Sequence, residues 1–110
     1  MSHLIMSAVF QRYPKGGGEM LLALSLADYA HDDGTRIDSS VASLAKKTRQ
    51  SVRTVQYQLK TMLMTGWLIL VNEGDGRYGQ HREYAISAAW LKGADFASLN
   101  QDNARKWGDR

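Results

Sequence analysis

The segment DSSVASLAKKTRQSVRTVQYQLKTMLMTG, residues 38–66, contains the pattern that decides the fold. Its first part predicts a short helix over residues 41–48, because apolar side chains recur on one helical face after a capping residue. Three residues can provide that cap through a side-chain oxygen: Asp38, Ser39 and Ser40. The pair Arg49-Gln50 then makes a two-residue break before a second, longer helix.

This second helix is predicted to start after Ser51, its cap, and to run to about Thr65, with Gly66 ending it. Its apolar residues share one stripe: Val52, Val55, Leu59, Met62 and Leu63. The opposite side is polar and basic: Arg53, Thr54, Tyr57, Lys60 and Thr61. We expect the stripe to pack on earlier helices and the polar side to face outward. Two short helices joined by a tight break, the second with such an outer face, are typical of a helix-turn-helix.

The flanking segments complete the expected order of elements. Upstream, residues 20–31 predict a largely buried helix and residues 35–37 a short edge strand or extended link. Downstream, residues 67–72 predict a buried strand, residues 73–81 a polar Gly-rich loop and residues 82–87 the returning strand of a hairpin. The expected fold class is therefore α+β, mainly α, with a three-helix core and a β-hairpin.

Length and composition limit the class of protein. The 110 residues suit one domain, which we place over residues 1–99, followed by a polar tail over residues 100–110. Because there is no cysteine, a disulfide framework, a thiolate zinc site and a cysteine nucleophile are excluded. No apolar run approaches the roughly 20 residues that a membrane span needs, and no signal peptide is recognisable. We therefore expect a cytoplasmic protein with no membrane partner.

The formal charge of +3 is unevenly distributed along the chain. Residues 35–82 carry eight basic and three acidic side chains, and no acid occurs between Asp38 and Glu73. That acid-free stretch contains five cations: Lys46, Lys47, Arg49, Arg53 and Lys60. A compact basic surface of this kind is expected of a nucleic-acid binder, and a solvated basic face without a partner is the alternative.

Three stretches, DSSVASLAKKT (38–48), SVRTVQYQL (51–59) and GWL (66–68), resemble the winged helix-turn-helix domains of phage and plasmid replication-initiation proteins. Bacterial transcription regulators share this architecture, and LALSLADYA (22–30) fits the family's first helix. The resemblance implies sequence-specific binding of double-stranded DNA, with the helix after the turn in the major groove and the hairpin wing on the backbone or minor groove. It implies base contacts from Ser51, Arg53, Thr54 and Tyr57, and wing contacts from Arg77, His81 and Arg82.

Further candidate DNA contacts lie around the turn: Lys46, Lys47, Gln50, Gln58 and Lys60. The lysines can meet phosphates or remain solvated, and a glutamine amide can bond adenine bidentately. Arg49 is a candidate contact as well, although relatives often have Gly at this turn position. If the position needs a positive φ, Arg costs about 1 kcal/mol there. Gln50 replaces a residue that is usually apolar in the family.

Other kinds of site are disfavoured. GDGRYG, residues 74–79, matches the GxGxxG pattern, but a strand follows it where a dinucleotide site needs a helix. His3, His31 and His81 have no partners at metal-ligand spacing, so we expect no metal and no cofactor. Because no group of polar residues in the sequence suggests an active site, we expect that the protein is not an enzyme. The main alternative to DNA binding is a winged helix used for protein assembly, within a replication complex or a homodimer.

Overall fold

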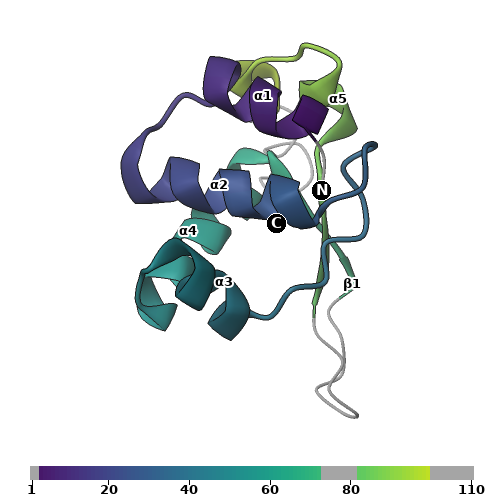
Figure 1. Ribbon diagram of the computed structural model, residues 1–110. Helices are drawn as coiled ribbons and strands as arrows, with labels where there is room; N and C mark the ends of the chain where they lie inside the picture. Colours follow the sequence, from purple (N-terminus) through teal and green to yellow (C-terminus); the bar gives the residue numbers. More distant parts are fainter. Residues whose placement is uncertain (1–2, 73–81, 100–110) are drawn as a thin grey trace, which may run out of the picture.

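The computed structural model describes residues 3–72 and 82–99, which form an α+β, mainly helical domain with one antiparallel hairpin (Figure 1). The elements follow in the order α1 (His3–Arg12), α2 (Gly17–Tyr29), α3 (Val41–Thr48), α4 (Val52–Thr65), β1 (Leu68–Asn72), β2 (Glu83–Ile86) and α5 (Ala88–Leu91). One more helical turn covers residues 96–99. The coarse fold class predicted from the sequence is therefore confirmed.

The helix α1 lies on one side of α2 (Figure 1) and comes from a segment that the sequence marks only as apolar. Ile5 and Val9, one helical turn apart, are buried against the body, whereas Leu4 and Phe10 point outward. On its other side α2 contacts α3 and α4. The helix α2 is thus the central element of the domain, which explains why so much of its surface is apolar.

The two helices of the turn segment have the predicted bounds. Among the three candidate caps, Ser40 is the one that accepts a hydrogen bond from the backbone N–H of Ser43, at 3.0 Å. Ser51 caps α4 in the same way, accepting from the N–H of Thr54 at 3.1 Å. Gly66 ends α4 with a φ of 87°, a conformation that favours glycine.

Two burial predictions are wrong. Val52, expected in the apolar stripe, lies in the first turn of α4 and is 46% exposed, whereas Val55, Leu59 and Met62 are buried. The strand expected as buried is only half so, since Leu68 faces the core whereas Ile69 and Val71 face outward. In both cases apolar residue types predict burial, but the tertiary fold leaves these side chains in contact with solvent.

The hairpin joins β1 and β2 in antiparallel register, with Leu68 opposite Ile86 and an irregularity between Leu70 and Asn72. Ile37 extends this sheet by exchanging backbone hydrogen bonds with Tyr84, at 3.0 and 2.7 Å. Of residues 35–37 only Ile37 pairs with the sheet, and Arg36 has a positive φ of 63°, so the segment is a link that ends in one edge bridge rather than a strand.

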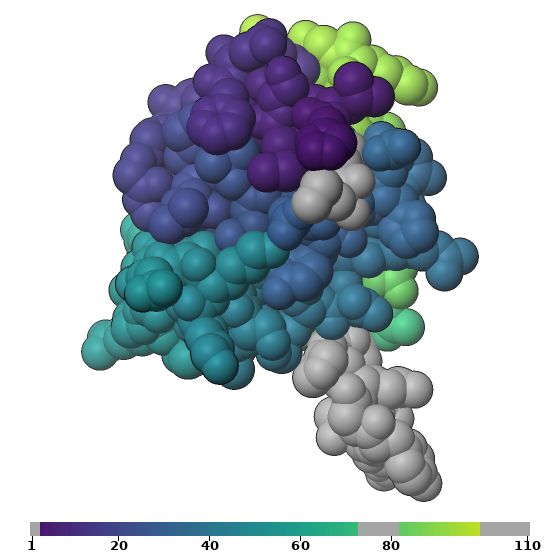
Figure 2. Space-filling model, in the orientation of Figure 1, coloured from purple at the N-terminus to yellow at the C-terminus, as the bar shows by residue number. Residues whose placement is uncertain are grey.

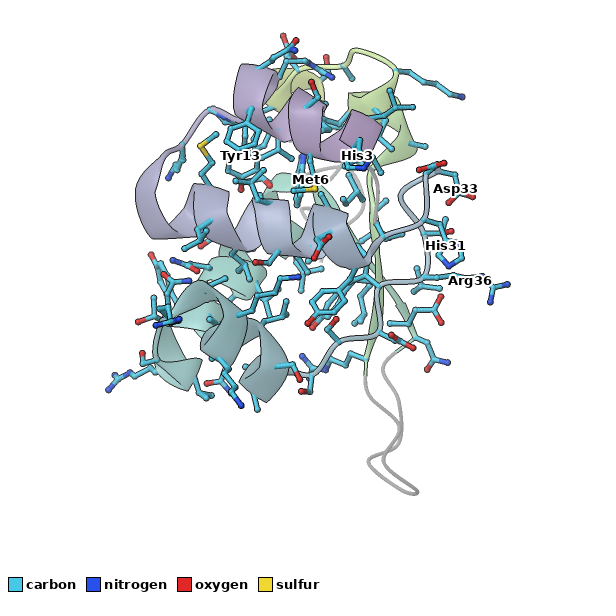
Figure 3. All side chains as sticks on the ribbon, viewed as in Figure 1. His3, Met6, Tyr13, His31, Asp33 and Arg36 are labelled. Carbon is cyan, nitrogen blue, oxygen red and sulfur yellow. The ribbon has the colours of Figure 1, made fainter. Side chains whose placement is uncertain are left out.

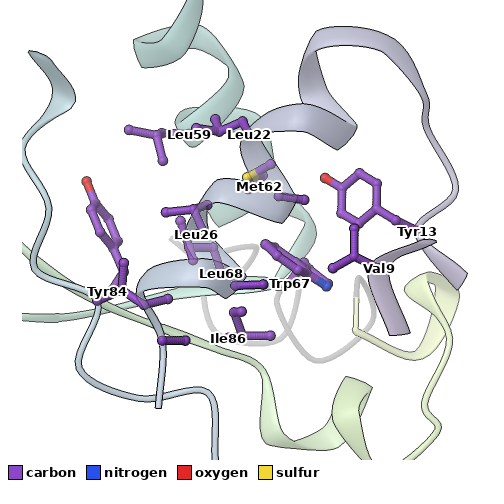
Figure 4. Packing of buried hydrophobic residues seen from close by; sticks show 14 of the residues in the cluster. Val9, Tyr13, Leu22, Leu26, Leu59, Met62, Trp67, Leu68, Tyr84 and Ile86 are labelled. Carbon is purple, nitrogen blue, oxygen red and sulfur yellow. The ribbon is translucent and has the colours of Figure 1, made fainter. Parts of the chain in front are cut away.

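Aromatic side chains join the two ends of the described chain in the core, in which Figure 4 shows Tyr13 and Trp67. The Trp67 ring lies edge-to-face against Tyr13 and Trp90, with centroids 5.1 and 5.6 Å apart. The guanidinium of Arg12 lies 4.4 Å from the Trp90 ring centroid and donates to the carbonyl of Ala94 at 3.1 Å. These contacts hold α1 and α5 on the body that carries α3 and α4.

Candidate nucleic-acid interface

The exposed side of α4 is the centre of the candidate interface. Val55, Leu59 and Met62 are buried, and this burial fixes which side of the helix faces the body. The opposite side is exposed to solvent: Ser51, Arg53, Thr54, Tyr57 and Lys60. Tyr57 is the most exposed of the large apolar side chains on α4, at 72%. No acidic residue occurs on α3 or α4, whose teal surfaces adjoin in Figure 2.

The two lysines at the end of α3 differ in their surroundings. Lys46 is exposed, and Lys47 forms an ion pair with Asp28 of α2. The Lys47 ammonium also lies 4.3 Å from the Tyr29 ring centroid. Lys47, a predicted phosphate contact, is therefore held by the protein itself, and its charge is partly offset by Asp28. Lys46 is the freer of the two cations.

The break between α3 and α4 has a strained backbone. Arg49 has φ 59° and ψ 40°, the left-handed region, so the positive φ considered from the sequence is present. The backbone N–H of Gln50 donates to the carbonyl of Ala45 at 3.0 Å, which closes the end of α3. This geometry leaves the Arg49 side chain exposed at the turn.

The structure holds Gln50 and Gln58, two predicted DNA contacts, against each other rather than on the exposed side of α4. Gln58 is 9% exposed and Gln50 is half-buried. Each side-chain Nε2 donates to the Oε1 of the other, both at 2.9 Å. Polar groups at the edge of a core must be paired, and these two amides satisfy each other. The residue types alone did not distinguish such a pair from two exposed glutamines.

A groove of about 530 Å³ runs beside α4 between the start of α3 and β2. Val41, Leu59 and Leu63 contribute apolar side chains to its lining, and Lys60 and Arg82 contribute cations. Gln56, exposed on α4, also lines it. Arg82 is the one predicted wing contact that the structure describes, and it is exposed. Arg77, His81 and the tail over residues 100–110 lie outside the described residues.

Other kinds of site find no support in the described part of the chain. No three His, Asp or Glu side chains among these residues could hold a metal ion together. Figure 3 shows His3 on α1 and His31 on the loop after α2, on separate elements. Within the same residues, no helix is both long and apolar enough to cross a bilayer. No family model, curated protein or solved structure matches the chain.

Proposed function

We propose that the chain is a winged helix-turn-helix domain that binds double-stranded DNA sequence-specifically. In this proposal α3 and α4 form the helix-turn-helix, and the hairpin of β1 and β2 is the wing. The observation that carries it is the exposed side of α4, which contains no acidic residue. The buried apolar stripe on the opposite side fixes which residues face outward. The biological role that suits such a domain is replication initiation of the phage or plasmid type, or transcription regulation.

The residues divide into two kinds of contact. Arg53 and Thr54, in the first turn of α4, and Tyr57, in the second, face the bases in the major groove, where Arg can bond guanine bidentately. Val52 adds an exposed aliphatic group suited to a thymine methyl. Lys46, Arg49, Lys60 and Arg82 are exposed cations that suit phosphates and make binding depend on salt.

The first test selects duplexes from a random pool and measures the dissociation constant by fluorescence anisotropy. Four phosphate contacts predict that affinity falls on the order of 100-fold between 50 and 200 mM salt. Arg53→Ala and Tyr57→Ala should each weaken binding at least tenfold while the thermal midpoint stays near that of the wild type. Lys92→Ala and Phe10→Ala, exposed residues of matching chemistry on other elements, should bind normally.

A second candidate is a protein-assembly module, favoured by two exposed apolar side chains on α1. Leu4 is 76% and Phe10 64% exposed, on the side of α1 away from the body. If the wild type binds no duplex at 50 mM salt, DNA binding is refuted. Sedimentation of the wild type and of Phe10→Ala then tests for self-association through α1. If the chain does not associate with itself, an assembly module of this kind would have to bind a different protein.

A further inference from the structure

The side chains of Gln50 and Gln58 form a closed pair that lies behind the exposed side of α4. The two reciprocal hydrogen bonds, both 2.9 Å, use one donor and one acceptor of each amide. Such a pair is directional, because both bonds stay short only when the two amides keep one mutual orientation. An apolar pair of similar volume would fill the space without imposing that orientation.

The pair is connected to the end of α3. The Nε2 of Gln50 also lies 3.2 Å from the hydroxyl oxygen of Thr48. The Thr48 hydroxyl is buried and donates to the carbonyl of Leu44 at 2.8 Å. This chain of hydrogen bonds runs from the last turn of α3, across the strained break, to the second turn of α4.

The pair also meets the start of α2 at Gly18. A Cβ atom at position 18 would lie 2.1 Å from the Oε1 of Gln50 and 3.0 Å from the Nε2 of Gln58. Glycine at this position therefore makes room for the amides, although its backbone φ does not require it. Three helices, α2, α3 and α4, meet at one polar contact.

We infer that the Gln50–Gln58 pair is a positioning element, which sets the orientation in which α4 presents Arg53, Thr54 and Tyr57 to DNA. These three residues lie between Ser51, which caps the helix, and Gln58, which ties its second turn to the break. The stretch proposed to enter the major groove is thus held at both ends. The inference rests on the proposed DNA binding and adds residues that act through α4 without touching the bases.

The sharpest test compares Gly18→Ala with Gly16→Ala. A Cβ at Gly16 meets nothing within 4 Å, whereas a Cβ at Gly18 displaces the Gln50 amide. Alanine favours the helical backbone at position 18, so the cost of the displaced amide is offset and the variant should fold. We expect Gly18→Ala to lose about tenfold in affinity for the selected duplex. Gly16→Ala, at the N-cap of α2, should bind like the wild type, and circular dichroism should show both variants folded at the temperature of the binding assay.

A second pair of variants separates orientation from packing. Gln58→Leu leaves the half-buried Gln50 amide without its partner and should lower both the thermal midpoint and the affinity. The double variant Gln50→Leu with Gln58→Leu removes both polar groups and should recover the thermal midpoint, while its affinity stays about tenfold low. Wild-type affinity in the double variant, or equal affinity of the two glycine variants, would overturn the inference.

The outcome is also distinguishable from a failure of the proposed function. If the wild type binds no duplex, backbone amide chemical shifts of residues 51–57 provide the measurement. The positioning role is supported if these chemical shifts differ from the wild type in Gly18→Ala and match the wild type in Gly16→Ala. Shifts unchanged in both variants refute it, whether or not DNA is the ligand. Should the double variant fail to fold, the comparison of Gly18→Ala with Gly16→Ala decides the inference alone.

Discussion

Two arginines adopt the left-handed backbone conformation that favours glycine. Arg49 has φ 59° and Arg36 has φ 63°. Each such residue costs about 1 kcal/mol relative to an unstrained conformation. We therefore expect Arg49→Gly and Arg36→Gly to be neutral or stabilising by up to about 1 kcal/mol in chemical denaturation, in contrast to glycine at an ordinary helical position.

The same pair separates strain from binding. Arg49 lies at the turn beside α4, and Arg36 lies on the loop before Ile37, where Figure 3 shows it pointing away from the helices. Arg49→Gly should also reduce the salt dependence of DNA binding by about one phosphate contact, while Arg36→Gly leaves it unchanged. An identical salt slope in both variants would remove Arg49 from the interface.

Tyr13 gives a prediction about alkaline pH. Burial raises the pKa of the Tyr13 phenol well above its ordinary value, and its hydrogen bond to Glu19, 2.8 Å long, adds to the effect. Because the pKa is higher in the folded than in the unfolded state, the neutral phenol contributes stability below about pH 10, and this is lost as pH rises further. The stability difference between the wild type and Tyr13→Phe should be constant up to pH 9 and then move in favour of Tyr13→Phe. A difference independent of pH from 8 to 11 in urea titrations would contradict it.

At the scale of elements, the turn segment depends on two serine caps. Ser40 and Ser51 each accept a hydrogen bond from a backbone N–H three residues on. Ser40→Ala and Ser51→Ala should each lower the free energy of unfolding by about 1 kcal/mol. Ser39→Ala is the matched control, since Ser39 is a neighbouring serine that the sequence equally allowed as the cap. Equal loss in Ser39→Ala would mean that the cap is misassigned.

Ser51→Ala carries a second consequence, because Ser51 is also a proposed base contact. Its effect on affinity should exceed that of Ser40→Ala when both are measured well below their thermal midpoints. Equal affinities would limit Ser51 to its capping role. The comparison is useful because both changes destabilise a helix end by the same mechanism.

For the whole molecule, stability depends on the packing around α2. Leu22 is fully buried at this central helix, whereas its neighbour Leu21 is 43% exposed. Leu22→Ala should cost about 2–5 kcal/mol, a large part of the total stability of a domain of this size, and Leu21→Ala no more than about 1 kcal/mol. Thermal denaturation followed by circular dichroism checks both variants. Similar losses of stability in the two would contradict the central position of α2 in the domain.

The local signals of the sequence were sufficient for the bounds of α3 and α4. Capping serines, the apolar spacing of α4 and the terminal Gly66 act within a few residues of one another, so they operate in any fold that contains the segment. The coarse class and the exposed side of α4 followed from the same periodicity. The helical form of α1 did not, because apolar character alone does not select a helix over an extended segment.

Long-range contacts decided the remainder. Gln58 is paired with Gln50, eight residues earlier, and the charge of Lys47 is partly offset because α2 brings Asp28 alongside. Val52 is 46% exposed although it shares the apolar spacing of the buried Val55 and Leu59. The sequence by itself determined where the helices of the turn begin and end, since capping and periodicity are local. Only the tertiary structure decided which polar groups remain free to meet a ligand, since pairing depends on what the fold places opposite each side chain.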